Sequence, residues 1–178
     1  MGHGKRGLHG ANVFIIFCGL PGTGKTTLAR ELARQLGAVY LRIGTIECAI
    51  ASAKDIPVGE AGYRVGYAVA EDNLRLGRTV VADSVNPLRV TRDAWRDVAV
   101  RAGVIFVEVL VVCSDPIEHR HRVETRTTDI AGFTLPTWQE VLTREFEPWR
   151  REHVVIDTAD QTVEQSMAAL RAALPAHW

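Results

Sequence analysis

The chain has 178 residues, of which 47% are hydrophobic and 24% are charged, and its acidic and basic side chains balance at 21 each. This length suits one domain with a substantial core, and the zero net charge gives no support to a nucleic-acid partner or an anionic membrane surface. No apolar run reaches the roughly 18 to 20 residues of a membrane span. Three scattered cysteines without a C-x-x-C spacing favour free thiols in a reducing, cytoplasmic setting over disulfides or a zinc site.

The first residues differ in composition from the rest of the chain. Residues 1–11 are rich in glycine, histidine and basic side chains, and we expect a disordered tail there. The apolar run 13–18 is too short for the core of a signal peptide and leads into a glycine-rich segment instead of a cleavage site. We therefore expect a single domain over residues 12–178.

Short apolar runs alternate with helical patterns along this domain. Runs rich in β-branched and aromatic residues predict five strands, at 13–18, 38–43, 79–82, 104–113 and 154–156. Helical spacing and terminal glycines predict helices at 26–36, 62–76, 91–101, 116–126, 137–152 and 162–174. Strands joined by such helices form right-handed crossovers, so we expect an α/β three-layer sandwich, a parallel sheet with helices on both faces.

The segment after the first strand reads G-L-P-G-T-G-K-T and fits the phosphate-binding pattern G-x-x-x-x-G-K-[ST]. Its glycines allow successive N–H groups to turn toward phosphates, and the helix that comes next adds its dipole. Lys25 can reach the β- and γ-phosphates, Thr26 offers a hydroxyl to Mg²⁺, and Thr27 suits the α-phosphate end. The expected ATP-binding residues are Gly19, Leu20, Pro21, Gly22, Thr23, Gly24, Lys25, Thr26 and Thr27.

The residues at the ends of the later strands disfavour two classes of nucleotide hydrolase. The third strand continues as Ala82-Asp83-Ser84 and the fourth as Cys113-Ser114-Asp115, so neither carries the glutamate with which a motor ATPase activates water. The Asn-Lys-x-Asp sequence by which GTPases read their base is also missing. By elimination, the sequence favours phosphoryl transfer to a bound small molecule.

Asp83 is the candidate catalytic carboxylate. It comes directly after the third strand, at the edge where sheets of this kind bind ligands. From there it can hold Mg²⁺ through water or accept a proton from an acceptor hydroxyl. The alternative is that Asp83 only caps the next helix or forms an Asx turn. Asn86 lies at the next turn.

Two arginines form the second candidate constellation. Arg122 and Arg126 are four residues apart in a predicted helix and therefore share one face. Two guanidinium groups on one face can clamp a transferring phosphoryl group and stack on an adenine ring. The alternative is a solvated basic face partly paired with Glu118 and Glu124.

With these residues located, the chain resembles the P-loop small-molecule kinases. The particular likeness is to the predicted-kinase group related to polynucleotide kinase and seryl-tRNA kinase. Three motifs carry the resemblance across roughly residues 13–174: the segment 19–26, Asp83-x-x-Asn86 followed by Arg92-x-x-Trp95, and Arg122-x-x-x-Arg126. The resemblance implies the strand order 2-3-1-4-5 and a lid at about 116–135 whose arginines close over ATP. It also implies that Thr158 and Ala159 lie beside the adenine.

One position departs from the pattern that the resemblance implies. Members of that group usually have an acidic residue at the end of the second strand, and this chain has Gly44 there. Three interpretations follow. Glu47, one turn later, can take over the role of general base, or Asp83 alone can serve as that base. The third is that this chain has weakened catalysis. On the acceptor side the candidate substrate-binding residues are Arg42, Gly44, Arg64, Asn86 and Arg92, although Arg42 and Arg64 also fit ordinary surface positions.

The sequence therefore predicts an ATP- and Mg²⁺-dependent phosphotransferase. Lys25, Asp83, Arg122, Arg126 and Glu47 are its expected catalytic residues, and a small molecule is its expected acceptor. Two alternatives stay open: a nucleotide-binding regulatory or toxin-like module with little or no catalysis, and a nucleic-acid or tRNA-linked kinase. The sequence identifies neither the acceptor nor the oligomeric state.

Overall fold

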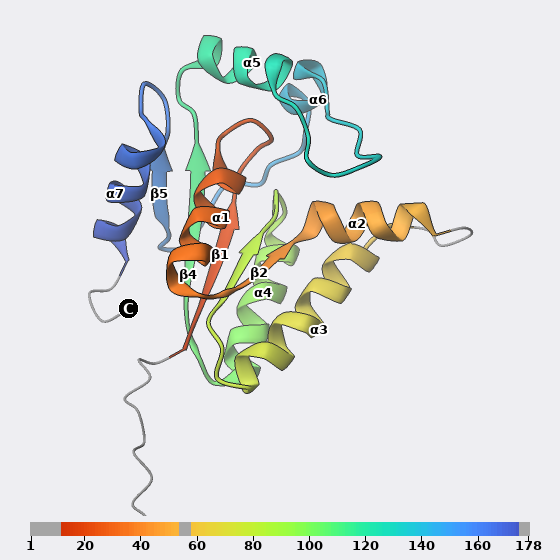
Figure 1. The fold of residues 1–178 in the computed structure, drawn as a ribbon, viewed down its shortest axis with the longest axis vertical. Coiled ribbons are helices and arrows are strands. Elements are labelled where there is room, and N and C mark those ends of the chain that lie inside the picture. The colour runs from red at the N-terminus through yellow and green to blue at the C-terminus, as the bar shows by residue number, and fades with distance from the viewer. Residues whose placement is uncertain (1–11, 54–57, 175–178) are drawn as a thin grey trace, which may run out of the picture.

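A computed structural model of the chain describes residues 12–53 and 58–174. The tail expected at 1–11 lies outside these residues. Strands and helices alternate along the chain (Figure 1). Their order and bounds are β1 Val13–Cys18, α1 Lys25–Leu36, β2 Val39–Arg42, α2 Ile43–Ser52, α3 Ala61–Arg75, β3 Val80–Asp83, α4 Arg89–Ala102, β4 Ile105–Val112, α5 Pro116–Thr125, α6 Trp138–Leu142, β5 Val154–Asp157 and α7 Val163–Ala173.

The five strands form one parallel sheet in the order β2-β3-β1-β4-β5, which confirms the expected fold class and topology. β1 lies at the centre, and all six of its residues are buried. A strand covered on both faces cannot alternate polar and apolar side chains, which explains its continuous apolar run. Because β1 pairs with both β3 and β4, the segment after it is placed at the middle of the sheet edge.

Helices cover the sheet in two layers, each with its own core. On one face, Leu28 and Leu32 of α1 and Met167 and Leu170 of α7 pack against Phe17 and its neighbours. On the other face, α3 and α4 pack against a cluster that includes Phe14, Ile16 and Trp95. Figure 1 shows α1 and α7 on one side of the strands and α3 and α4 on the other. This arrangement is the expected three-layer sandwich.

The helix predicted for 137–152 is wrong over most of its length. α6 ends at Leu142, and residues 143–152 form an irregular strap. Pro148 is the physical reason, because it lacks an N–H group and disfavours helical backbone in Glu147 before it. The strap instead pairs with the body of the domain: the backbone N–H of Glu147 donates to the carbonyl of Pro87.

A second difference concerns the end of the second strand. β2 ends at Arg42, and Ile43 begins helix α2, which was not predicted from the sequence. Gly44 therefore lies in the first turn of a helix.

No helix in the described part of the chain is long and apolar enough to cross a membrane.

A buried carboxylate links the strap to the sheet. Glu108 of β4 is 4% exposed, and its two oxygens accept hydrogen bonds from Arg151 at 2.6 and 2.5 Å. Arg151 also pairs with Asp93 of α4. A buried charge is tolerated when it is paired and hydrogen-bonded in this way.

We predict that Arg151→Leu lowers the free energy of unfolding by about 3 kcal/mol, because it leaves the buried Glu108 carboxylate without its partner. Urea denaturation measures the loss. The control is Arg64→Leu, which removes an ion pair between side chains that are 78% and 83% exposed and changes stability little. Equal losses in the two variants would contradict the role given to Arg151.

Candidate active site

The segment between β1 and α1, residues 19–24, is a tight loop. Gly19 has φ +146°, and a Cβ atom there would lie 2.3 Å from the carbonyl oxygen of Val111 in β4. Gly22 has φ +88°, and a Cβ atom would lie 2.5 Å from the Val123 side chain of α5. Side chains at these positions are therefore excluded by backbone conformation and by close approach. The loop therefore packs directly against β4 and α5.

Helix α1 begins with its N–H groups free of side-chain caps. Its N-cap residue is Gly24, and its first turn contains no acidic residue. The unpaired N–H groups and the positive end of the helix dipole suit an anion such as a phosphate. Lys25 is the first residue of this helix and is 9% exposed. Burial lowers the pKa of Lys25, and the negative charge of Asp83 opposes this shift.

Asp83 ends β3 and lies between β1 and β2, paired in register with Phe17 on one side and Arg42 on the other. Its side chain is 2% exposed. The hydroxyl of Tyr40 donates to Asp83 Oδ2 at 2.7 Å, and Arg42 Nε lies 4.0 Å from the same oxygen. Tyr40 and Arg42 are two residues apart on β2 and therefore share one face of the sheet. Asp83 is thus an oriented carboxylate and does not cap a helix.

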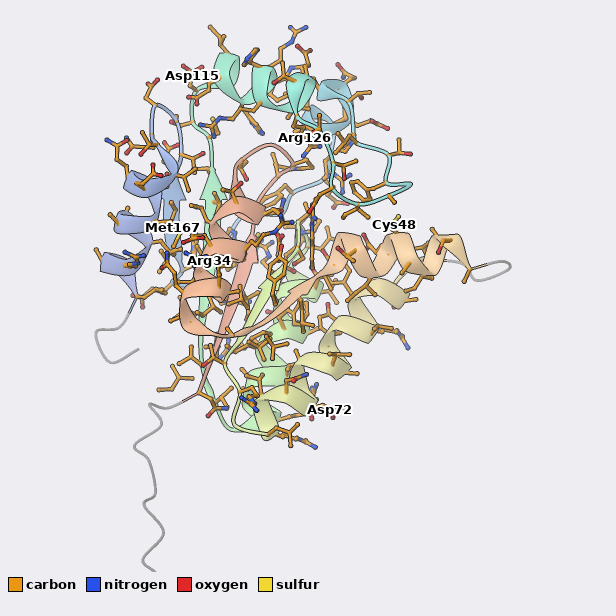
Figure 2. All side chains as sticks on the ribbon, viewed as in Figure 1. Arg34, Cys48, Asp72, Asp115, Arg126 and Met167 are labelled. Atoms are coloured by element: carbon orange, nitrogen blue, oxygen red, sulfur yellow. The ribbon has the colours of Figure 1, made fainter. Side chains whose placement is uncertain are left out.

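The two lid arginines have different surroundings. Arg122 donates to the hydroxyl and the carbonyl of Thr158 at 2.8 and 2.9 Å and pairs with Glu118. Arg126 lies at the end of α5, near the loop and the start of α1 (Figure 2). Its Nε and Nη2 atoms are buried and have no hydrogen-bond partner among the described residues. Burial lowers the pKa of Arg126.

The loop after β5 is joined to the glycine-rich loop. The Thr158 hydroxyl lies 2.9 Å from the carbonyl oxygen of Thr23, and the Ala159 N–H donates to Asp157 at 3.0 Å. A cavity of about 310 Å³ adjoins this contact and is lined by Gly24, Thr27, Leu28, Arg122, Thr158, Gln161, Val163 and Ser166. The position expected to border an adenine ring therefore lies directly beside the phosphate-binding segment.

One large cleft contains most of the expected site residues. It has a volume of about 1470 Å³ and is lined by Lys25, Thr26, Arg42, Gly44, Glu47, Tyr63, Asp83, Arg122, Arg126 and Phe133, among others. A pocket for one small ligand typically measures 300 to 1,000 Å³, and this open cleft is larger than that range. Burial raises the pKa of Glu47. A Cβ atom at Gly44 would lie 3.7 Å from the Phe133 ring, so an aromatic side chain of the segment after α5 lies within van der Waals contact of this position.

Three expected substrate-binding residues lie outside this cleft. Arg64 is exposed and pairs with Glu60. Asn86 is fully buried, and its backbone N–H donates to the Tyr63 hydroxyl at 3.0 Å. Arg92 is 3% exposed, donates to the carbonyl of Glu147 at 2.8 Å and lies 4.6 Å above the Trp149 ring. Arg92 therefore holds the strap in place, because its guanidinium group donates to the backbone carbonyls of Pro87, Leu88 and Glu147, and its expected role in substrate binding stays a prediction.

Some residues that shape the site were not predicted. Besides Tyr40, these include His119, whose Nε2 lies 2.8 Å from the carbonyl oxygen of Pro21 and whose ring meets the edge of Trp138. His119 therefore joins α5 to both the loop and α6. The sequence shows that Tyr40 and Arg42 are two residues apart. Only the pairing of β2 with β3 shows that both side chains lie beside Asp83.

The protein oxygens expected to hold Mg²⁺, the Thr26 hydroxyl and the Asp83 carboxylate, both line the cleft. Within 12–53 and 58–174, no group of three or more His, Cys, Asp or Glu side chains could hold a metal ion. Mg²⁺ commonly binds through one or two protein oxygens together with substrate phosphates and water, which fits this donor set.

Comparison with known proteins gives the family. A family profile described as "AAA domain" matches residues 14–148. The chain belongs to this family. No curated protein matches the sequence.

Solved structures show the same P-loop kinase fold. A putative kinase from Chloroflexus aurantiacus aligns with a TM-score of 0.69 at 19% identity, covering 93% of this chain and 100% of that one. The structure of the Mycobacterium tuberculosis APS kinase CysC in complex with AMPPNP and APS aligns with a TM-score of 0.66 at 18% identity. The alignment covers 90% of this chain and 96% of that one. A gluconokinase from Sinorhizobium meliloti aligns with a TM-score of 0.61 at 21% identity, covering 92% of this chain and 93% of that one.

We predict that Gly19→Ala destabilises the protein by about 2 kcal/mol or more, because the new methyl group would meet the Val111 carbonyl in a backbone conformation that disfavours alanine. Gly37→Ala is the matched control: its φ is +59° and a Cβ atom there has nothing within 4 Å. Urea denaturation of both variants measures the difference. A loss at Gly37 as large as that at Gly19 would contradict the close approach.

A second prediction concerns pH. The pKa of Glu47 is raised by burial, so the folded protein holds this proton more tightly than the unfolded chain does, and the charged form opposes folding at higher pH. Glu47→Gln should therefore gain stability relative to the parent as the pH rises from 4 to 8. Denaturation midpoints at several pH values test this. A difference between the two proteins that does not change with pH contradicts it.

Proposed function

We propose that the protein transfers the γ-phosphoryl group of Mg²⁺-ATP to a hydroxyl group of a small molecule. The observation that carries this proposal is that Lys25, Arg126 and Asp83 face one cleft whose volume exceeds the need of a single ligand. A buried lysine and a partly buried arginine beside the free N–H groups of a helix suit a polyphosphate, since buried positive charge is unfavourable until an anion binds. The solved APS kinase and gluconokinase with the same fold support the choice of a phosphotransferase.

The nucleotide would lie on residues 19–27. In this arrangement Lys25 contacts the β- and γ-phosphates and the Thr26 hydroxyl contributes to the Mg²⁺ site, with the metal neutralising charge on the phosphates when bound. Arg126, whose buried nitrogens lack partners among the described residues, supplies positive charge to the transferring group. Arg122, which donates to the hydroxyl and the carbonyl of Thr158, would keep this residue in position beside the base.

The acceptor would occupy the other end of the cleft, between Asp83, Glu47 and Phe133. Asp83 is the proposed acceptor of the hydroxyl proton, because it is buried, oriented by Tyr40 and adjacent to Lys25. Glu47 shares the cleft and takes a binding role. Phosphoryl transfer depends mainly on positioning and charge stabilisation, so a carboxylate at residue 44 is not required for it.

The direct test is acceptor-dependent formation of ADP. We predict that Lys25→Ala and Asp83→Asn each lower kcat by about 10²- to 10³-fold, which is typical for the loss of one group that stabilises the transition state. Tyr40→Phe should lower kcat less, by roughly tenfold, because it removes the hydrogen bond that orients Asp83. A coupled ADP assay over a panel of hydroxyl acceptors gives the rates.

The same assay separates the proposal from a binding module. If the parent chain binds ATP but no acceptor stimulates turnover, while Gly44→Asp does gain turnover, the protein is a nucleotide-binding module with weakened catalysis. The Gly44→Asp variant has room at residue 44 for its first side-chain carbon, because a Cβ atom there would lie in ordinary van der Waals contact with the Phe133 ring.

A further inference from the structure

We infer that Arg30 and Arg42 form a binding site for an anionic group of the acceptor, and that the Asp129 carboxylate, which contacts both arginines, competes with that group for the site. The inference deepens the proposed function, on which it rests, by naming the acceptor's class: a molecule that carries a carboxylate, phosphate or sulfate group besides its reactive hydroxyl.

Two guanidinium groups from different elements converge on one carboxylate. Arg30 Nη2 of α1 lies 2.5 Å from Asp129 Oδ2, and Arg42 Nη1 of β2 lies 2.7 Å from Asp129 Oδ1. Each arginine thus contacts a different oxygen, as two arginines would when they bind a carboxylate or an oxyanion of phosphorus or sulfur. The carboxylate comes from the segment after α5, far away in the sequence.

The site lies beside the proposed point of transfer. Arg42 points Nη1 toward Asp129, and its Nε lies 4.0 Å from Asp83. Arg30 is one helical turn after Thr26 on α1, and the arginines, Asp129 and Asp83 all line the same cleft. An anionic group held by the pair would therefore bring the rest of the acceptor next to Asp83.

Asp129 is placed so that it can be exchanged for a ligand. Its side chain is 54% exposed and that of Arg30 is 52% exposed, whereas Arg42 is 18% exposed. Exposed ion pairs are held weakly because water and salt screen them, so an anion that contacts the more buried Arg42 competes well. The same segment contacts α2 through the Cys48 thiol, which donates to the Ala131 carbonyl at 3.2 Å, and Cys48 lies near the tip of this loop in Figure 2. Release of Asp129 would thus loosen one of the contacts that hold the lid segment over the acceptor end.

The test is the binding of sulfate by Asp129→Asn, measured by isothermal titration calorimetry at low salt without nucleotide. We expect the variant to bind sulfate roughly threefold to fivefold more tightly than the parent, the gain expected when an exposed competing ion pair is removed. Sulfate binding at the glycine-rich loop is the same in both proteins. The difference between their sulfate affinities therefore reports on the arginine pair. Adding Arg42→Gln or Arg30→Gln to Asp129→Asn should abolish the gain.

The chain offers a matched control. Glu71 also bridges two arginines, Arg75 at 2.5 Å and Arg101 at 2.8 Å, but none of the three lines the cleft. Glu71→Gln changes the net charge by the same amount and frees two guanidinium groups elsewhere. We expect no gain in sulfate affinity from it. An equal gain in both variants, no gain in Asp129→Asn, or a gain that survives Arg42→Gln would overturn the inference.

An acceptor screen separates this inference from the proposed function. Hydroxyl compounds of similar size, with and without an anionic group, are compared for ADP formation. Selective use of the anionic compounds, with a KM that falls in Asp129→Asn, supports the anion site. Turnover with neutral compounds alone overturns the anion site and upholds the kinase. Sulfate binding by the arginine pair without turnover on any acceptor upholds the anion site and contradicts the kinase.

Discussion

The close packing of the glycine-rich loop is the constraint on which the rest of the site depends. Gly19 lies against the backbone of β4, Gly22 against α5, and the carbonyl of Thr23 against the hydroxyl of Thr158. Three segments that are distant in the sequence are therefore placed relative to one loop at van der Waals distance. Because these contacts involve backbone atoms, they leave little freedom for the loop to adjust, and its N–H groups are oriented before any ligand arrives.

The same packing explains why the two lid arginines differ. Helix α5 is held on the loop by Val123 and by the hydrogen bond between His119 and Pro21, and one turn later Arg122 is bound to Thr158. Arg126 lies beyond these contacts, and part of its guanidinium group is buried without a protein partner among the described residues. Arg122 is thus held by protein groups, whereas two nitrogens of Arg126 have no partner among the described residues, which supports the ligand-binding role proposed for it. A charge in this position is favourable only when an anion neutralises it.

At the end of the cleft proposed for the acceptor, residues of the segment after α5 line the cleft. Phe133 lies beside Gly44, Ala131 contacts Cys48, and Asp129 bridges Arg30 and Arg42. The carboxylates that line the cleft include Asp83 of β3 and Glu47 of α2.

The sequence by itself determined the topology class and the phosphate-binding segment. Residues 13–26 combine a buried strand, a glycine-rich turn and a lysine in a pattern whose local physics permits few other interpretations, and the alternation of strands and helices required a parallel sheet. The break at Pro148 was also present in the sequence, although helical spacing across 137–152 concealed it. Only the tertiary structure decided which side chains meet in the cleft. The pairing of β2 with β3 places Tyr40 and Arg42 at Asp83, whereas burial by the strap removes Arg92 from the cleft. Asp129 reaches Arg30 and Arg42 from a separation of 99 and 87 residues, and no local pattern encodes such a contact, because it depends on how the lid packs on the sheet.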